Sequence, residues 1–212
     1  MPAPEPRAGE ASLAPRRPVR RAGRSGEPDG SLTIWSVAEG RSGRRWRWRT
    51  IGPVGDAGAW LAATLETDPR GAFSKLEVAA PAGLLTLHRE ADGSTHGNVV
   101  RDGGVTHLAL GADVGAVLVA GSRLGLAAVV ASLGRAIPVG AEVSRDVLLV
   151  DRRLVPARSA IRVRRVTATA WHLAPPGPAL GGPLELDGTL ELDGDTLPAP
   201  IASDEGWPLE AG

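Results

Sequence analysis

The sequence predicts an all-β protein in which an antiparallel meander forms a curved sheet or an incomplete β-barrel. From residue 31 onward, short apolar or alternating runs are separated by Gly, Pro or Asp-Gly pairs. Such a series of short strands and turn signals is typical of meanders and barrels. The composition, with 42% apolar and 23% charged residues, is ordinary for a folded domain. No segment predicts a helix.

The expected strands can be placed in order along the chain. They are 31–37, 44–51, 59–67, 73–79, 84–90, 97–101, 105–110, 115–120, 124–131, 144–150, 160–170, 184–187 and 189–192. Turns are predicted where Gly supplies a positive φ or Pro a fixed one. These turns are Asp68–Gly71, Glu90–Gly93, Arg101–Gly104 and Leu186–Gly188, and the Pro-rich segment 173–183 is expected to be a loop.

The clearest alternation lies in the strand that contains two tryptophans. Trp46 and Trp48 fall on one face of this strand, and Arg45, Arg47 and Arg49 fall on the other. We therefore expect the tryptophans to face the interior and the arginines to face water.

The segment 105–131 alternates poorly, so we expect it to be buried on both faces or to curve tightly at its glycines. Its stretch 114–130 is the nearest approach to a membrane span. Arg123 lies near the middle of that stretch, where a charge costs roughly 2.5 to 3.5 kcal/mol in a bilayer. Buried strands at 115–120 and 124–131 explain the segment better.

Two parts of the chain are expected, a tail of residues 1–30 and a single β-rich domain of residues 31–212. The tail is dense in Pro, Gly, Ala and Arg and has almost no large apolar side chain. It cannot repay the entropy of ordering, so we expect it to be disordered. The remainder, roughly 180 residues, is long enough for one buried core.

Charge and cysteine content exclude several classes of function. The formal net charge is zero, so no overall field attracts nucleic acid or an anionic membrane. The chain has no cysteine, which excludes disulfides, thiolate metal sites and a cysteine nucleophile.

An export signal would require an apolar stretch after the arginine pairs near the N-terminus, and the sequence has none there. We expect a cytoplasmic protein with no transmembrane segment.

The residues that most often carry chemistry form no known constellation. The histidines are His88, His96, His107 and His172. They lack the close pairing on one strand that a metal barrel needs. No Gly-x-Ser-x-Gly motif surrounds a serine, no phosphate loop surrounds Lys75, and Asp193–Asp195 is too short for a calcium loop. We expect no metal, no cofactor and no catalytic residue.

Several segments between residues 59 and 192 share a layout with a known family. They are Lys75–Val78, Leu84–Gly93, Leu110–Val114, Val139-Gly140, Asp146–Val150, Arg164-Arg165 ahead of Trp171, and Leu184–Gly188. In this layout the chain resembles a bacterial glycolipid-binding family of β-rich proteins. The resemblance implies a curved sheet or incomplete barrel whose concave face holds acyl chains. Gly121–Gly125 replaces the family's Thr-Asn, Pro and paired arginines, so no family site residue is carried over.

The expected function is non-catalytic binding of an apolar or amphipathic ligand, such as a glycolipid, in a β-sheet cavity. The residues predicted to line this cavity are Trp46, Trp48, Trp60 and Trp171. Plain core packing is the other account of the paired tryptophans.

Two other classes of function stay open at this point. The first is an enzyme on the same scaffold, with His96 or His107 beside an aspartate as a general base, which requires the histidine to lie in the cavity. The second is a protein or nucleic-acid interaction module that uses the sheet edges and the basic tail.

Overall fold

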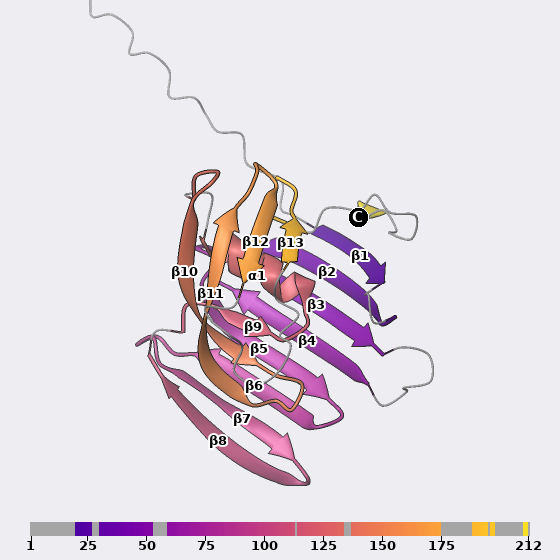
Figure 1. The fold of residues 1–212 in the computed structure, drawn as a ribbon. Helices are drawn as coiled ribbons and strands as arrows, with labels where there is room; N and C mark the ends of the chain where they lie inside the picture. The colour runs from indigo at the N-terminus through magenta and orange to yellow at the C-terminus, as the bar shows by residue number, and fades with distance from the viewer. Residues whose placement is uncertain are drawn as a thin grey trace, which may run out of the picture.

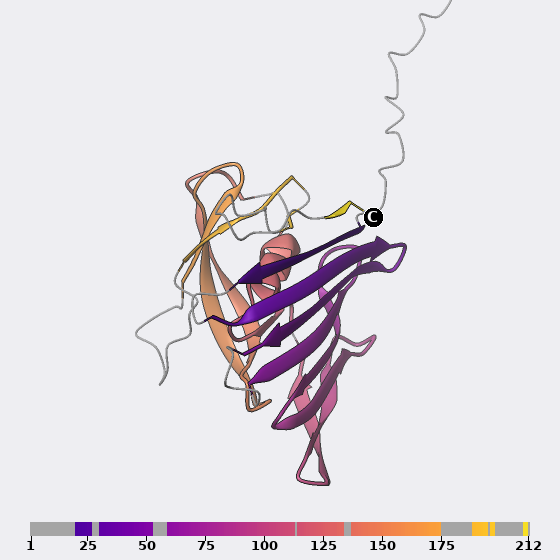
Figure 2. The ribbon, with the colours of Figure 1, turned by 90° about the vertical axis from the view of Figure 1, so that its right-hand side faces the viewer.

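The protein consists of two β-sheets that enclose one short helix, as the computed structural model shows (Figures 1 and 2). The structure describes residues 20–26, 30–52, 59–112, 114–133, 137–174, 188–194, 196–197 and 210–211. In Figure 2 the two sheets splay apart like an open V, and the helix α1 lies between them. The predicted all-β class, with its curved antiparallel meander, is confirmed.

The large sheet is an antiparallel meander of consecutive strands. Its strands are β1 (Arg20–Gly26), β2 (Leu32–Gly40), β3 (Gly43–Ile51), β4 (Trp60–Thr67), β5 (Phe73–Ala80), β6 (Gly83–Arg89), β7 (Thr95–Arg101) and β8 (Gly104–Gly111), with β14 (Glu210–Ala211) beside β1. Each strand from β1 to β8 pairs with the next along the chain. The turns predicted at Asp68–Gly71, Glu90–Gly93 and Arg101–Gly104 connect these strands, with Gly71, Gly93 and Gly103 at positive φ.

The small sheet has five strands in the order β13-β12-β11-β10-β9. They are β9 (Val117–Val119), β10 (Glu142–Val150), β11 (Pro156–Arg165), β12 (Ala170–Ala174) and β13 (Gly188–Glu191). β9 runs parallel to β10, whereas the other neighbours are antiparallel. The predicted strand 160–170 is divided, because a turn over residues 166–169 separates β11 from β12. The expected strand 184–187 lies outside the described residues.

The strand predicted at 124–131 is wrong, because this segment forms the helix α1 (Arg123–Leu133). Ser122 caps the helix: its Oγ accepts a hydrogen bond from the Gly125 N–H at 3.0 Å. Residues 124–130 are all buried, so the segment lacks the polar face that would mark a surface helix. The helix is also the crossover that a parallel β9–β10 pair requires. Among the described residues, no helix has the length and hydropathy to span a bilayer.

Part of the segment expected to be a disordered tail is a strand. β1 pairs with β2 over its full length, from Arg20 opposite Ala38 to Gly26 opposite Leu32. Its small and charged residues show no alternating pattern. Its backbone N–H and C=O groups nevertheless form hydrogen bonds with those of β2, which would otherwise be unpaired at the edge of the sheet. Residues 1–19 and 27–29 lie outside the described part of the chain.

The predicted inward face of β3 is confirmed. Trp48 lies in a cross-strand row with Trp35, Ala63, Val78 and Leu85, all of which are buried. The arginines that alternate with the tryptophans are exposed on the other side of the sheet.

Candidate functional site

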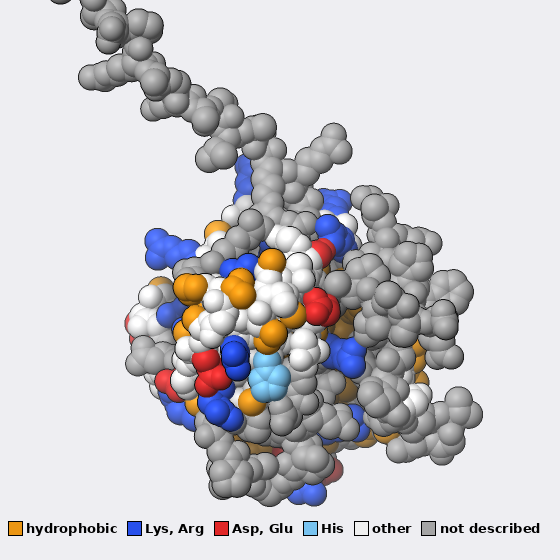
Figure 3. Space-filling view, turned by 45° about the horizontal axis from the view of Figure 1, so that its top comes forward, with side chains coloured by type: hydrophobic (Ala, Val, Ile, Leu, Met, Phe, Trp, Pro, Cys, Tyr) orange, Lys and Arg blue, Asp and Glu red, His pale blue; other side chains and the backbone are white. Residues whose placement is uncertain are grey.

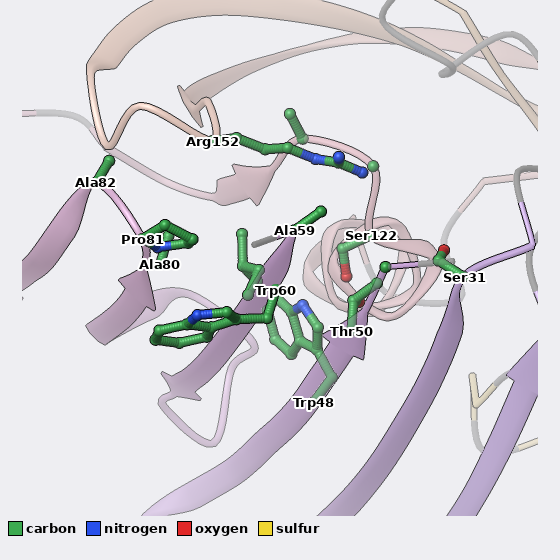
Figure 4. A pocket seen from close by; sticks show the side chains of 14 residues that line it. Ser31, Trp48, Thr50, Ala59, Trp60, Ala80, Pro81, Ala82, Ser122 and Arg152 are labelled. Atoms are coloured by element: carbon green, nitrogen blue, oxygen red, sulfur yellow. The ribbon is translucent and has the colours of Figure 1, made fainter. Parts of the chain in front are cut away.

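A pocket of about 430 Å³ lies between the two sheets, beside the N-terminal end of α1 (Figure 4). Its lining residues come from the residue before β2, the end of β3, the start of β4, the β5–β6 turn, the loop after β9 and the β10–β11 turn. They are Ser31, Trp48, Thr50, Gly52, Ala59, Trp60, Leu61, Ala80, Pro81, Ala82, Ala120, Gly121, Ser122 and Arg152. The volume falls within the range of small-molecule sites, and most of the lining is apolar.

The structure divides the four predicted tryptophans into two pairs. Trp48 and Trp60 line the pocket and stand close together in Figure 4. Trp46 is 0% exposed in the core of the large sheet, and Trp171 is 3% exposed beneath the guanidinium of Arg165, 5.3 Å from its ring centre. Neither Trp46 nor Trp171 lines the pocket.

The β9–α1–β10 unit forms one wall of the pocket. Val119 pairs with Val150 at the carboxyl ends of the two parallel strands, and the Ala120 N–H donates to the Val150 carbonyl at 2.9 Å. Gly121 then turns the chain with φ at +72° into Ser122, the cap of α1. The carboxyl ends of parallel strands and the amino end of their crossover helix meet in a crevice, which is where open α/β units bind ligands.

The β10–β11 turn carries Arg152 over this crevice. Asp151 shapes the turn, because its Oδ1 accepts hydrogen bonds from the N–H groups of Arg153 at 3.0 Å and Val155 at 2.9 Å. Leu154 anchors the turn: it is fully buried and adopts a positive φ of 60°. In Figure 4 the side chain of Arg152 extends across the pocket, on the side opposite Trp48.

Replacing Asp151 with alanine is expected to lower the free energy of unfolding by about 1 to 2 kcal/mol. The change removes the acceptor of two backbone N–H groups in a turn that holds a residue at positive φ. Urea denaturation measures this loss. Asp151→Asn keeps an oxygen at the same place and is expected to lose less than half as much. Equal losses in the two variants would contradict the proposed role of Oδ1.

The indole N–H of Trp48 is a buried donor that has no acceptor among the described residues. The side chain is 3% exposed. Figure 4 shows its nitrogen at the end of the ring that faces Thr50 and Ser122. Buried indole N–H groups usually find a partner, so this one marks a place where an acceptor is missing.

The sequence did not predict two polar residues of the pocket, Ser122 and Arg152. The signal for Ser122 was present, since a serine directly before an Ala- and Leu-rich run is typical of a helix cap. Arg152 had no such signal, because its position depends on the pairing of β9 with β10.

The histidines proposed as general bases lie on the surface of the large sheet. His96 and His107 are both exposed and neither lines the pocket. His96 Nε2 lies 3.2 Å from the Ser94 hydroxyl, which donates to Asp92 at 2.6 Å. This hydrogen bond and one from the Ser94 N–H lower the pKa of Asp92. The condition set for the enzyme hypothesis, a histidine inside the cavity, is therefore not met.

Other site types find little support in the described residues. No group of three or more His, Asp or Glu side chains within them could hold a metal ion.

A second hollow of about 630 Å³ lies on the outer face of the large sheet, where Ile34, Arg49 and Leu84 are exposed. This hollow is more open to solvent than the pocket between the sheets, so it encloses a ligand less well.

Charges of both signs are interspersed on the face of the molecule in Figure 3, among hydrophobic side chains and one histidine. On the outer face of the large sheet, Arg45 pairs with Glu66 at 2.7 Å and Lys75 with Glu77 at 3.0 Å. On this face, the exposed row of Arg45, Arg47 and Arg49 on β3 therefore has an acidic partner at Arg45.

No family model matches the chain, and no curated protein matches it. The structure is similar to a solved structure, that of a DUF1089 family protein (PA1994) from Pseudomonas aeruginosa. The two chains share 16% sequence identity, and the TM-score is 0.49. The superposition covers 93% of this chain and 95% of that one. That description names no ligand, so the glycolipid-binding resemblance stays a prediction from the sequence.

Proposed function

We propose that this protein binds one apolar or amphipathic small molecule in the pocket between its sheets, without chemical conversion. The observation that carries the proposal is the pocket between the two sheets. It has the volume of a small-molecule site, two indole rings in its wall and polar groups gathered on one side. Trp48 and Trp60 form the apolar wall of this site.

Because most of the pocket wall is apolar, a ligand that fills the pocket displaces few water molecules that are hydrogen-bonded to the protein. Leu61, Ala80, Pro81 and Ala82 supply apolar surface to the wall of the pocket. An apolar chain placed there gains about 25 cal/mol for each Å² that it removes from water. The sequence resemblance adds glycolipids as the first class of ligand to try.

The proposal is tested with a neutral fluorescent probe, N-phenyl-1-naphthylamine. We expect saturable binding at one site per chain, together with displacement by dodecyl maltoside below its micelle concentration, which supplies one acyl-like chain and a sugar. Native mass spectrometry of the same preparation, beside a lipid extract, then reports any ligand that co-purifies.

A pocket-filling substitution and a matched control make the test specific. Ala82 lines the pocket at the β5–β6 turn, so Ala82→Trp is expected to reduce probe affinity at least tenfold, through loss of the cavity. Ala38 lies exposed on β2, away from the pocket, and Ala38→Trp is expected to leave the affinity unchanged. Absence of binding to the unaltered protein, or equal affinities for the two variants, would disprove the proposal.

A further inference from the structure

We infer that the ligand carries an anionic head group, and that this group is held by the Trp48 indole N–H, the first turn of α1 and the Arg152 guanidinium. This inference rests on the proposed function, because it assigns the chemistry of the ligand in the same pocket. The ligand is then a single-chain amphiphile that ends in a carboxylate, sulfonate or phosphate.

The first argument is the unsatisfied donor. Trp48 Nε1 is buried and has no acceptor within the described part of the chain. An indole nitrogen can only donate, so the missing partner is a hydrogen-bond acceptor, as the oxygens of an anionic head group are. The Trp46 Nε1 atom is also unsatisfied, but its ring lies in the core and lines no described pocket.

The second argument is the amino end of α1. The loop of Ala120, Gly121 and Ser122 lines the pocket directly before the first helical turn. Helix N-termini carry a partial positive charge and N–H groups without intrahelical partners, which favours bound anions. The Ser122 hydroxyl accepts from the Gly125 N–H, so its own proton is available to donate to the ligand. The first turn has no acidic residue.

The third argument is Arg152. This side chain lines the pocket, and a Cβ added to Gly121 would lie 3.8 Å from its Nη2 atom, so the guanidinium lies against the loop that caps α1. No carboxylate among the described residues pairs with Arg152, whereas Arg45 has an acidic partner. The Arg152 guanidinium and the Trp48 N–H lie on opposite sides of the pocket, with Ser122, the cap of α1, between them in Figure 4.

The apolar residues define the orientation of the ligand. Trp60, Pro81 and Ala82 lie away from Ser122 in Figure 4, toward the β5–β6 turn. An amphiphile with its head at Ser122 and Arg152 would place its chain along these residues. A free inorganic anion would leave that half of the pocket empty.

The experiment compares two probes that differ only in the head group. Dodecanoate and dodecanol are each titrated against N-phenyl-1-naphthylamine bound to the full-length protein at pH 8, where a carboxyl group is ionised. We expect dodecanoate to bind at least tenfold more tightly than dodecanol, and inorganic phosphate at the same concentration not to displace the probe.

Two substitutions remove the proposed contacts and one serves as a control. Arg152→Gln removes the charge, and Trp48→Phe removes the N–H while keeping an aromatic ring; each is expected to weaken dodecanoate about tenfold and dodecanol less than twofold. Arg153 lies next to Arg152 in the same turn but does not line the pocket, so Arg153→Gln is expected to change neither affinity.

The outcomes separate this inference from the proposed function. If the two probes bind equally well, and Arg152→Gln changes neither, the anionic head group is wrong although the pocket still binds amphiphiles. Displacement by phosphate alone, or equal effects of Arg152→Gln and Arg153→Gln, would also overturn the inference. Failure of both dodecyl compounds to displace the naphthylamine would overturn the proposed function as well.

Discussion

Trp46→Ala is expected to lower the free energy of unfolding by about 3 to 5 kcal/mol, without changing the affinity of the folded protein for a pocket ligand. Trp46 is 0% exposed and lies in a cross-strand row with Val37 and Leu65. The guanidinium of Arg44 lies 5.8 Å from its ring centre. Removing the ring leaves a cavity in the middle of the large sheet, which neighbouring strands cannot close without breaking their register.

Denaturant unfolding gives the stability, and naphthylamine titration of the folded fraction gives the affinity. Trp60→Ala provides the matched comparison. Trp60 is half-buried at the pocket, so its loss is expected to cost less than about 2 kcal/mol of stability but at least tenfold in affinity. If Trp46→Ala weakened binding as much as Trp60→Ala, the division of the tryptophans into core and pocket would be wrong.

The strands of the large sheet could be predicted because local signals agree there. Alternating residues mark the inner face of β3, and Gly at positive φ closes the turns at residues 93 and 103. Antiparallel neighbours joined by short turns need no information from distant parts of the chain. The prediction therefore placed β2 to β8 close to their observed positions.

The helix α1 was not predicted because seven consecutive residues of it, 124–130, are buried. Leu124 to Val130 are apolar on every side of the helix, so neither a helical nor a strand period shows. Short apolar runs of this kind are ambiguous, and the two valines favoured a strand. Packing against β9, β3 and β13 decided the outcome, together with the cap at Ser122.

The pocket could be predicted only in part. Trp46 and Trp48 share one face of β3, and the sequence pattern treats them alike. Their environments differ because Trp48 lies nearer the end of β3, beside Thr50, where the loop after β9 and the β10–β11 turn approach it. Residues that are about 70 to 100 positions apart in the sequence meet there, and no local pattern encodes such a meeting.

Gly97→Ala is expected to destabilise the large sheet by about 3 kcal/mol. Gly97 lies on β7 opposite Leu87, on the inner face of the sheet. A Cβ at this position would lie 2.0 Å from the Thr86 carbonyl oxygen and 2.6 Å from Leu87 Cδ2. The leucine can rotate away but the backbone carbonyl cannot, so β6 and β7 would have to separate. A glycine within a strand often marks such a close approach of two backbones.

The contrast with Gly104 isolates this steric cause from the general effect of replacing a glycine. Gly104 begins β8, is exposed, and a Cβ there would meet only the Arg101 carbonyl oxygen, at an ordinary 3.6 Å. Gly104→Ala is therefore expected to change the free energy of unfolding by less than about 0.5 kcal/mol. Urea denaturation of both variants measures the difference. Equal stabilities would contradict the close approach of the β6 backbone to Gly97. Because the pocket is formed at the ends of β3 to β6 and not at β7, the folded Gly97→Ala protein should still bind the naphthylamine with unchanged affinity.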